Sequence, residues 1–194
     1  MSPLKATRAV LLGLLIGVML TQFGLSLMRV EGHSMDPSLA AGELVVVLRP
    51  PLLALASALG GQRLALEARG AVVVVPEPRS SGRLLGMGRP LIVKRVVGRS
   101  GEAVAFRRGQ LLVDDEPLHE PWLHPDRVGT FSMAAVAVPA GSVFIAGDNR
   151  LPLASSDSRQ FGPVPASELR GRAVARLRLP WGADGLRSPL LPLL

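Results

Sequence analysis

Two residues of this chain, a lysine and a serine, have the side-chain types and settings that nucleophilic chemistry requires. The chain uses 20 arginines but only two lysines, and one of these, Lys94, lies inside the apolar run 91–97. On a strand, Lys94 would share its face with Ile92 and Val96. A buried lysine can lose its proton, which an arginine cannot, and neutral lysine is a general base. The run itself is equally consistent with a lysine that reaches solvent from a strand end.

The nucleophile that such a base would serve is Ser34, in the segment Glu31-Gly32-His33-Ser34-Met35-Asp36-Pro37. A serine hydroxyl attacks a carbonyl carbon only when a base removes its proton, and serine–lysine pairs do this in some hydrolases. His33 is a weaker candidate base, because adjacent residues on an extended loop point in opposite directions.

A third polar cluster begins with Gly147-Asp148-Asn149-Arg150 and continues with Ser155-Ser156-Asp157-Ser158-Arg159. It is either a polar loop tied by an ion pair or a shell that orients the base. The chain has no cysteine, and His119 and His124 lack a zinc-binding spacing. We therefore expect no metal and no cofactor.

The elements that would position these residues are short strands. Valine-rich runs bounded by glycine and proline occur at 44–48, 71–75, 91–97, 110–113, 136–138, 142–146 and 173–179. Residues 107–117 are typical of a hairpin with its turn at 114–116. Residues 170–179 alternate arginine with small or apolar residues, which gives either a solvated face or a face for lipid headgroups. Residues 50–70 predict only a short amphipathic helix or a loop near a membrane.

The N-terminal region predicts a membrane anchor. Residues 9–28 contain no charge, and 20 helical residues span about 30 Å. Lys5 and Arg8 precede the run, which favours a cytoplasmic N-terminus. A cleaved signal peptide is the alternative, but the run ends without an Ala-x-Ala-like site.

Few aromatic residues and no tyrosine argue against nucleic acid as a partner of this basic chain.

Taken in order, these pieces resemble the type I signal peptidases, which are membrane-bound serine–lysine endopeptidases. The matching motifs are Gly32-His33-Ser34-Met35-Asp36-Pro37, the run from Ile92 to Glu102, and the run from Gly147 to Pro165. The resemblance covers most of the chain except 50–70. It implies that Ser34 is the nucleophile and Lys94 the general base.

The resemblance also implies supporting roles. Ser155 would supply the hydroxyl that orients the lysine, with Ser156 as the substitute candidate. Asp157 and Arg159 would form an ion pair, and Asp148 would pair with Arg95. Met35 and Pro37 would shape the nucleophile loop and the substrate cleft. Gly32 stands where some relatives carry a serine that helps the oxyanion hole. The hole would then use the backbone N–H of Ser34.

The implied fold is mainly β, a largely antiparallel catalytic domain with a small inserted β cap, preceded by one transmembrane helix. We expect a cytoplasmic tail at 1–8, an anchor at 9–28 and an extracytoplasmic domain at 29–194 in the plasma membrane, with the cap near 99–142 and an uncertain insertion at 50–70. The implied substrates are preproteins with small residues before the cut, and the implied partner is the lipid bilayer.

Three alternatives remain open. A specialised processing peptidase would share every motif named above. A self-cleaving repressor of the same clan would be soluble, which the run 9–28 disfavours. A membrane-anchored binding protein without activity would not need both Ser34 and Lys94.

Overall fold

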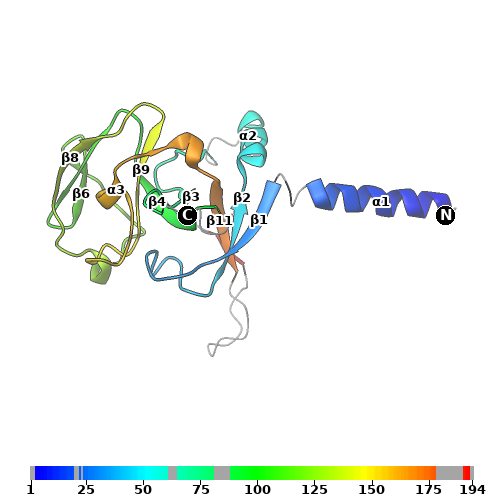
Figure 1. Cartoon of the computed structure of the whole chain (residues 1–194), viewed down its shortest axis with the longest axis horizontal. Helices are drawn as coiled ribbons and strands as arrows, with labels where there is room; N and C mark the ends of the chain where they lie inside the picture. The colour runs from blue at the N-terminus through cyan, green and yellow to red at the C-terminus, as the bar shows by residue number, and fades with distance from the viewer. Residues whose placement is uncertain are drawn as a thin grey trace.

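The computed structural model describes residues 3–19, 22, 24–60, 65–80, 88–177 and 190–192, and is built mainly of antiparallel β-sheet. The larger sheet has the strand order β1-β2-β11-β3-β4-β9-β10, with β12 paired to β11. Its strands are β1 (Leu25–Arg29), β2 (Leu44–Leu48), β3 (Val72–Pro76), β4 (Leu91–Gly98), β9 (Ser142–Ala146), β10 (Val164–Pro165), β11 (Gly171–Leu177) and β12 (Leu190–Pro192). Figure 1 shows this sheet between an N-terminal helix and a second, smaller sheet.

Valine-rich sequence explains the core of the larger sheet. All five residues of β3 are buried, and its register with β4 places Val73 opposite Lys94. Branched side chains pack well on a pleated surface, so these strands bury hydrophobic clusters on both faces. The expected strands at 44–48, 110–113 and 142–146 are confirmed with the same bounds, and those at 71–75 and 91–97 are shifted or extended by one residue.

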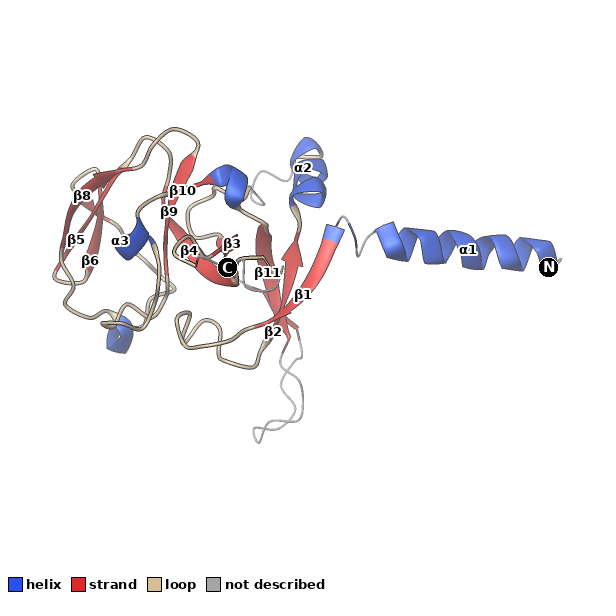
Figure 2. Ribbon diagram, in the orientation of Figure 1, coloured by secondary structure: helices blue, strands red, loops and turns tan. Residues whose placement is uncertain are grey.

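The smaller sheet, which we call the cap, lies where the inserted β region was expected. Its order is β7-β6-β5-β8, formed by β5 (Ala103–Arg107), β6 (Gln110–Val113), β7 (Glu116–Pro117) and β8 (Met133–Ala137). Figure 2 shows it as a separate group of strands beside β9. The β6–β7 turn has Asp114 at φ 52° and Asp115 at φ 66°, the positive values that a tight hairpin turn requires.

The expectation of one helix over 9–28 is wrong in its bounds. Helix α1 covers Pro3–Met19, and residues 25–28 belong to β1, which pairs antiparallel with β2. Apolar residues occur in buried strands as well as in membrane helices, so the continuous apolar run gave no sign of where the helix ends and the strand begins. Within the part of the chain that the structure describes, no helix combines the length and apolarity needed to cross a membrane.

The remaining helices are short: α2 (Pro50–Ala58), η4 (Pro125–Arg127), α3 (Ser158–Phe161) and η5 (Ala166–Glu168). Strand β11 does not present the expected simple face of arginines. Arg172 donates to the Ala65 carbonyl and Arg176 to the Ser38 carbonyl, and a register shift between Ala173 and Ala175 interrupts the alternation. These two arginines therefore hold loops against the sheet. Residues 178 and 179 of the predicted strand lie outside the described residues.

Candidate active site

Ser34 and Lys94, separated by 60 residues in sequence, meet beside β4, an interior strand of the larger sheet. Lys94 Nζ lies 2.7 Å from Ser34 Oγ and donates a second hydrogen bond of 3.0 Å to the Val93 carbonyl. Ser34 lies in the loop between β1 and β2 and is half-buried, whereas Lys94 in β4 is only 3% exposed. Ser34 is thus partly exposed, while the lysine that contacts its hydroxyl is buried.

Burial lowers the pKa of Lys94 from 10.5 to about 8, although Asp157 and more distant carboxylates act in the opposite direction. Removal of solvent penalises the ammonium form, and this effect exceeds the attraction of the negative charges. A lysine with a pKa near 8 is neutral often enough at neutral pH to accept a proton from a serine hydroxyl.

Asn149 holds the nucleophile loop from two positions. Its backbone N–H donates to the Ser34 carbonyl at 3.0 Å, and its side-chain amide donates to the His33 carbonyl at 3.0 Å. Among the described residues, no acceptor is found for the Ser34 backbone N–H. Gly32 adopts φ +78° and has open space around a Cβ position, so the chain turns sharply before the serine. The Ser34 N–H is therefore available to a developing oxyanion.

Asp157 organises the loop behind the lysine. Its carboxylate accepts from the Gly147 N–H at 2.9 Å, from Ser155 Oγ at 2.6 Å, and from Arg159 through two bonds of 2.9 Å. Burial alone would raise the pKa of Asp157, but the hydrogen bonds and charge of Arg159, with those of Gly147 and Ser155, lower it overall. Asp157 is thus an ion at neutral pH.

The geometry around Ser155 differs from the expectation. No hydrogen bond joins Ser155 to Lys94 within the described residues, and the hydroxyl donates to Asp157 instead. Ser155 still lies close to the nucleophile loop, because a Cβ on Gly147 would stand 2.4 Å from both Ser155 Oγ and the Ser34 carbonyl. Only glycine fits at 147, where these two segments converge. Ser156, the substitute candidate, is half-buried beside it.

Arg95, the neighbour of the lysine, forms a fully buried pair with Asp148. Two bonds of 2.8 and 2.6 Å join the guanidinium to the carboxylate, and a third of 2.8 Å reaches the Gly70 carbonyl. The Trp122 ring of the cap region stacks on Arg95 at 4.7 Å. Paired and stacked in this way, Arg95 fixes the middle of β4, next to Lys94.

A second buried ion pair, between Arg150 and Glu120, ties the cap region to the site. Arg150 is 1% exposed; it bonds to Glu120 and donates from Nε to the Gly147 carbonyl at 2.6 Å. Its backbone N–H donates to the Arg127 carbonyl at 2.8 Å. Sequence reasoning placed Asn149 in the third polar cluster without a role of its own, and it missed Glu120 and Trp122 as members of this region, since no local spacing pattern marks them.

The two predicted cleft residues occupy different settings. Met35 is 1% exposed and packs in the hydrophobic core with Leu39 and Val45, so its side chain supports the nucleophile loop from beneath. Pro37 is exposed at the surface of the same loop. His33 is also exposed, and its ring contacts Asp36 at 3.0 Å rather than Ser34. No group of three or more metal-binding side chains exists among the residues that were described.

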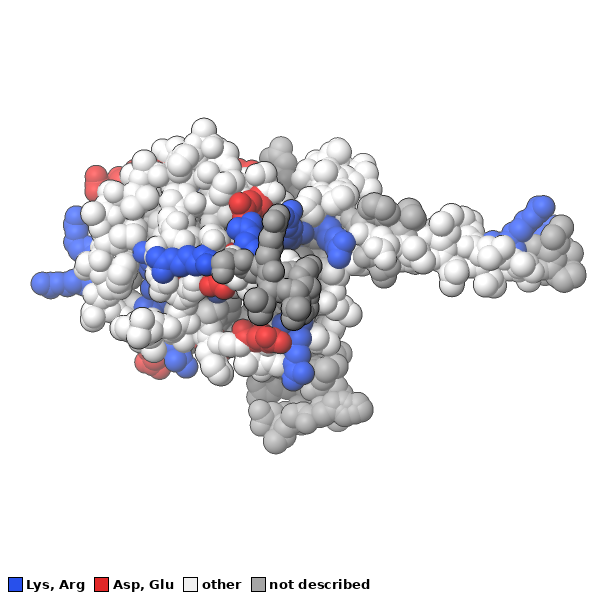
Figure 3. All heavy atoms as spheres, in the orientation of Figure 1, with Lys and Arg blue, Asp and Glu red and all other residues white. Residues whose placement is uncertain are grey.

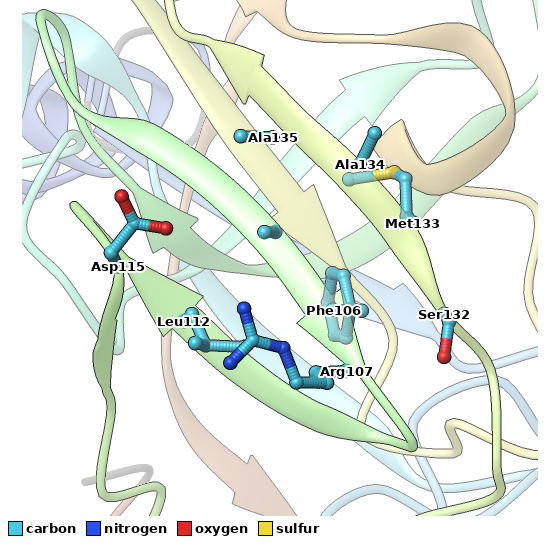
Figure 4. A pocket seen from close by; sticks show the side chains of 9 residues that line it. Phe106, Arg107, Leu112, Asp115, Ser132, Met133, Ala134 and Ala135 are labelled. Atoms are coloured by element: carbon cyan, nitrogen blue, oxygen red, sulfur yellow. The ribbon is translucent and has the colours of Figure 1, made fainter.

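A hollow of about 390 Å³ lies on the cap, away from this site. Its lining includes Phe106, Arg107, Leu112, Asp115 and Met133, which come from β5, β6, the following turn and β8 (Figure 4). None of the predicted site residues lines it.

A mainly antiparallel β domain in which a serine hydroxyl contacts a buried lysine amine has the architecture of a serine peptidase. The family model described as signal peptidase, peptidase S26, matches residues 4–179. This chain therefore belongs to the signal peptidase family, and it is a hydrolase of the serine peptidase class.

Individual relatives agree with this placement. The chain is 30% identical over 187 residues to signal peptidase I of Streptococcus pneumoniae TIGR4, covering 77% of this chain and 80% of the relative. It is 31% identical over 159 residues to signal peptidase I of Bacillus caldolyticus, covering 76% of each. A solved signal peptidase I from Enterococcus faecalis V583 aligns with a TM-score of 0.43 at 25% identity, covering 54% of this chain and 94% of that one; the fold assignment rests on the sheets described above.

Proposed function

We propose that this chain is a membrane-anchored endopeptidase that removes signal peptides with Ser34 as nucleophile and Lys94 as general base. The observation that carries the proposal is the 2.7 Å contact between Ser34 Oγ and an amine that is 3% exposed. Removal of signal peptides is the activity of the family, and the assignment of the two residues rests on this contact together with the motif match.

In the proposed mechanism, neutral Lys94 accepts the Ser34 proton as Oγ bonds to the carbonyl carbon of the scissile peptide. The carbonyl oxygen becomes an oxyanion that accepts from the Ser34 N–H. Lys94 then gives its proton to the leaving amine as the carbon–nitrogen bond breaks. A water molecule, deprotonated by the same lysine, hydrolyses the acyl-enzyme and restores the Ser34 hydroxyl.

The surrounding residues position the two reacting groups. The pair Asp148–Arg95 holds the middle of β4. Asp157, with Arg159 and Ser155, holds the loop behind Lys94, and Asn149 holds the Ser34 carbonyl. In this proposal Ser155 acts through Asp157, which contributes the largest favourable charge on the Lys94 ammonium. Preproteins with small residues before the cut would bind in extended form beside Ser34 and Lys94.

Membrane anchoring is the second part of the proposal and rests on the N-terminal segment. Helix α1 leaves the domain as a separate rod (Figure 1), and its large apolar side chains, such as Val10 and Leu14, are 68% and 67% exposed. Exposed apolar surface of this kind is stable in lipid rather than in water. An anchor would place enzyme and preprotein in one membrane with the N-terminus in the cytoplasm, as the position of Lys5 and Arg8 favours.

The test is cleavage of a preprotein with an Ala-x-Ala site by the full chain in detergent. Lys94→Arg keeps the charge but cannot act as a base, and Ser34→Ala removes the nucleophile; we expect each to reduce cleavage by about 10⁴-fold or more. Lys5→Arg changes the only other lysine in the same manner and should cleave normally.

Equal cleavage by wild type and Lys94→Arg would exclude the lysine as the base. In that case His33, the remaining candidate, would be tested as His33→Gln. No cleavage by a folded wild-type chain of any preprotein with small residues before the cut would contradict the proposed substrate class.

A further inference from the structure

Helix α2 (Pro50–Ala58) is apolar on its exposed face as well as on the face that packs against the domain. Pro51, Ala54, Leu55 and Ala58 follow the i, i+3, i+4, i+7 spacing of one helical face, yet all four are exposed. Only Leu53 is buried. A surface helix normally carries polar or charged residues on its outer face. Here the stripe points away from the domain, and Leu55 is 56% and Leu59 81% exposed.

No charged residue interrupts this surface, since residues 50–61 contain none. Figure 3 shows the corresponding area as white surface, with basic side chains next to it. An uncharged helix with its apolar stripe in water is unfavourable by about 25 cal/mol for every Å² of apolar area. Such a patch is typical of a docking site.

The start of α2 is fixed where the N-terminal segment enters the domain. The Arg49 N–H donates to the Gly24 carbonyl at 2.8 Å, and Arg49 Nη1 donates to the Gln22 carbonyl at 2.8 Å. A nine-residue helix is about 14 Å long. Every residue of α2 therefore lies within about 20 Å of Gly24, the residue that precedes β1.

Cations flank the same place. A hollow of about 540 Å³ beside the start of α2 is lined by Arg49 and Arg170, together with Pro50 and Pro51. An apolar helical stripe next to guanidinium groups matches the boundary between acyl chains and anionic phosphates. Leu27 of β1, 63% exposed, adds apolar surface on the strand that follows the entry point.

We propose that α2 is a second membrane contact, which lies in the interface of an anionic bilayer with Leu55 and Leu59 among the acyl chains and Arg49 and Arg170 at the phosphates. The proposal rests on the membrane anchoring proposed above, and extends it to a segment outside the motifs of the family. A second contact would fix the rotation of the catalytic domain about the anchor, and with it the height of Ser34 above the membrane.

The absence of cysteine from the sequence allows a direct test. An environment-sensitive fluorophore would be attached to single cysteine variants of the full-length chain, reconstituted into vesicles. The test variants are Leu55→Cys and Leu59→Cys, and the control is Ala134→Cys on β8, at the far end of the cap. We expect lipid-borne quenchers to quench the labels at 55 and 59 and not the label at 134. The quenching should be greater in vesicles containing phosphatidylglycerol than in pure phosphatidylcholine, and Arg49→Gln with Arg170→Gln should remove that difference.

A functional arm separates this proposal from the proposed activity. The double variant Leu55→Glu, Leu59→Glu should cleave a vesicle-embedded preprotein about tenfold less efficiently and a short soluble peptide at the wild-type rate, with Ala134→Glu as the matched control. The proposal would be overturned if lipid-borne quenchers did not quench the labels at 55 and 59, or if the labels left water in proportion to protein concentration rather than to lipid. Cleavage of the preprotein in the same samples would still support the proposed peptidase activity. Lipid quenching in a chain that cleaves neither substrate would contradict the activity alone.

Discussion

Replacing Lys94 by methionine is expected to stabilise the protein while abolishing cleavage. The buried amine has its pKa lowered from 10.5 to about 8, because the folded state disfavours the ammonium form. At about 1.4 kcal/mol per pH unit, this difference costs about 3 kcal/mol of folding free energy at pH 7. Methionine fills a similar volume without charge, so Lys94→Met should recover most of this cost.

The sign of the pH dependence makes the prediction specific. Between the two pKa values the unfolded chain binds more protons than the folded one at this position, so the stability of the wild type rises with pH. The difference in unfolding free energy between Lys94→Met and wild type should therefore shrink from about 3 kcal/mol at pH 7 to about 1 kcal/mol at pH 10.

The assay is guanidinium unfolding of the full chain in mild detergent, followed by circular dichroism at several pH values. Lys5→Met, an exposed position on α1, serves as the control and should show no pH-dependent difference. A variant less stable than wild type at pH 7, or a difference that stays constant up to pH 10, would refute the lowered pKa of Lys94 on which its assignment as the base depends.

Three further predictions concern the geometry of the site. The kcat/KM of the wild type should rise with pH with a midpoint near 8. In Asp157→Asn the midpoint of the residual activity should move to lower pH, because the Asp157 charge raises the pKa of Lys94. A midpoint unchanged by the substitution would contradict this coupling. Gly147→Ala should reduce kcat about 100-fold, since its Cβ would displace Ser155 and the Ser34 carbonyl, while Gly88→Ala meets no atom within 4 Å and should retain normal kinetics. Glu120→Gln should lower the unfolding free energy by about 3 kcal/mol, because Arg150 would keep a buried charge without its partner, whereas Glu168→Gln in the half-exposed Arg89 pair should cost less than about 1 kcal/mol by the same unfolding measurement.

The sequence predicted the sheets well and the N-terminal region only in part. Short valine-rich runs between glycine and proline leave little choice but strands, which is why β2, β6 and β9 were found with their observed bounds. Residues 25–28 were assigned to a helix because an apolar run has the same composition in a strand as in a membrane span. The pairing of β1 with β2 is a tertiary contact, and it makes residues 25–28 a strand rather than a helix.

The candidate site could be predicted as far as residue type carries the information. Lys94 was conspicuous as a lysine in an apolar run of an arginine-rich chain, and Ser34 by its motif. The partners of Asp157 could not be resolved in the same way, since whether the Ser155 hydroxyl faces the lysine or the carboxylate depends on a rotamer. Likewise, Arg150 pairs with Glu120, which lies 30 residues earlier in the sequence, and no local pattern encodes that pairing.

The contacts of Arg150 have a consequence for how this enzyme can be modified. The residue is bonded on one side to Glu120 and Arg127 of the cap region, and on the other to Gly147 beside the nucleophile loop. The cap region and the 147–159 loop therefore share one buried ion pair and cannot be exchanged as independent modules. A chimera that receives the cap of a relative would have to receive the matching 147–159 loop with it, and a minimised enzyme without the cap would lose its active-site scaffold as well.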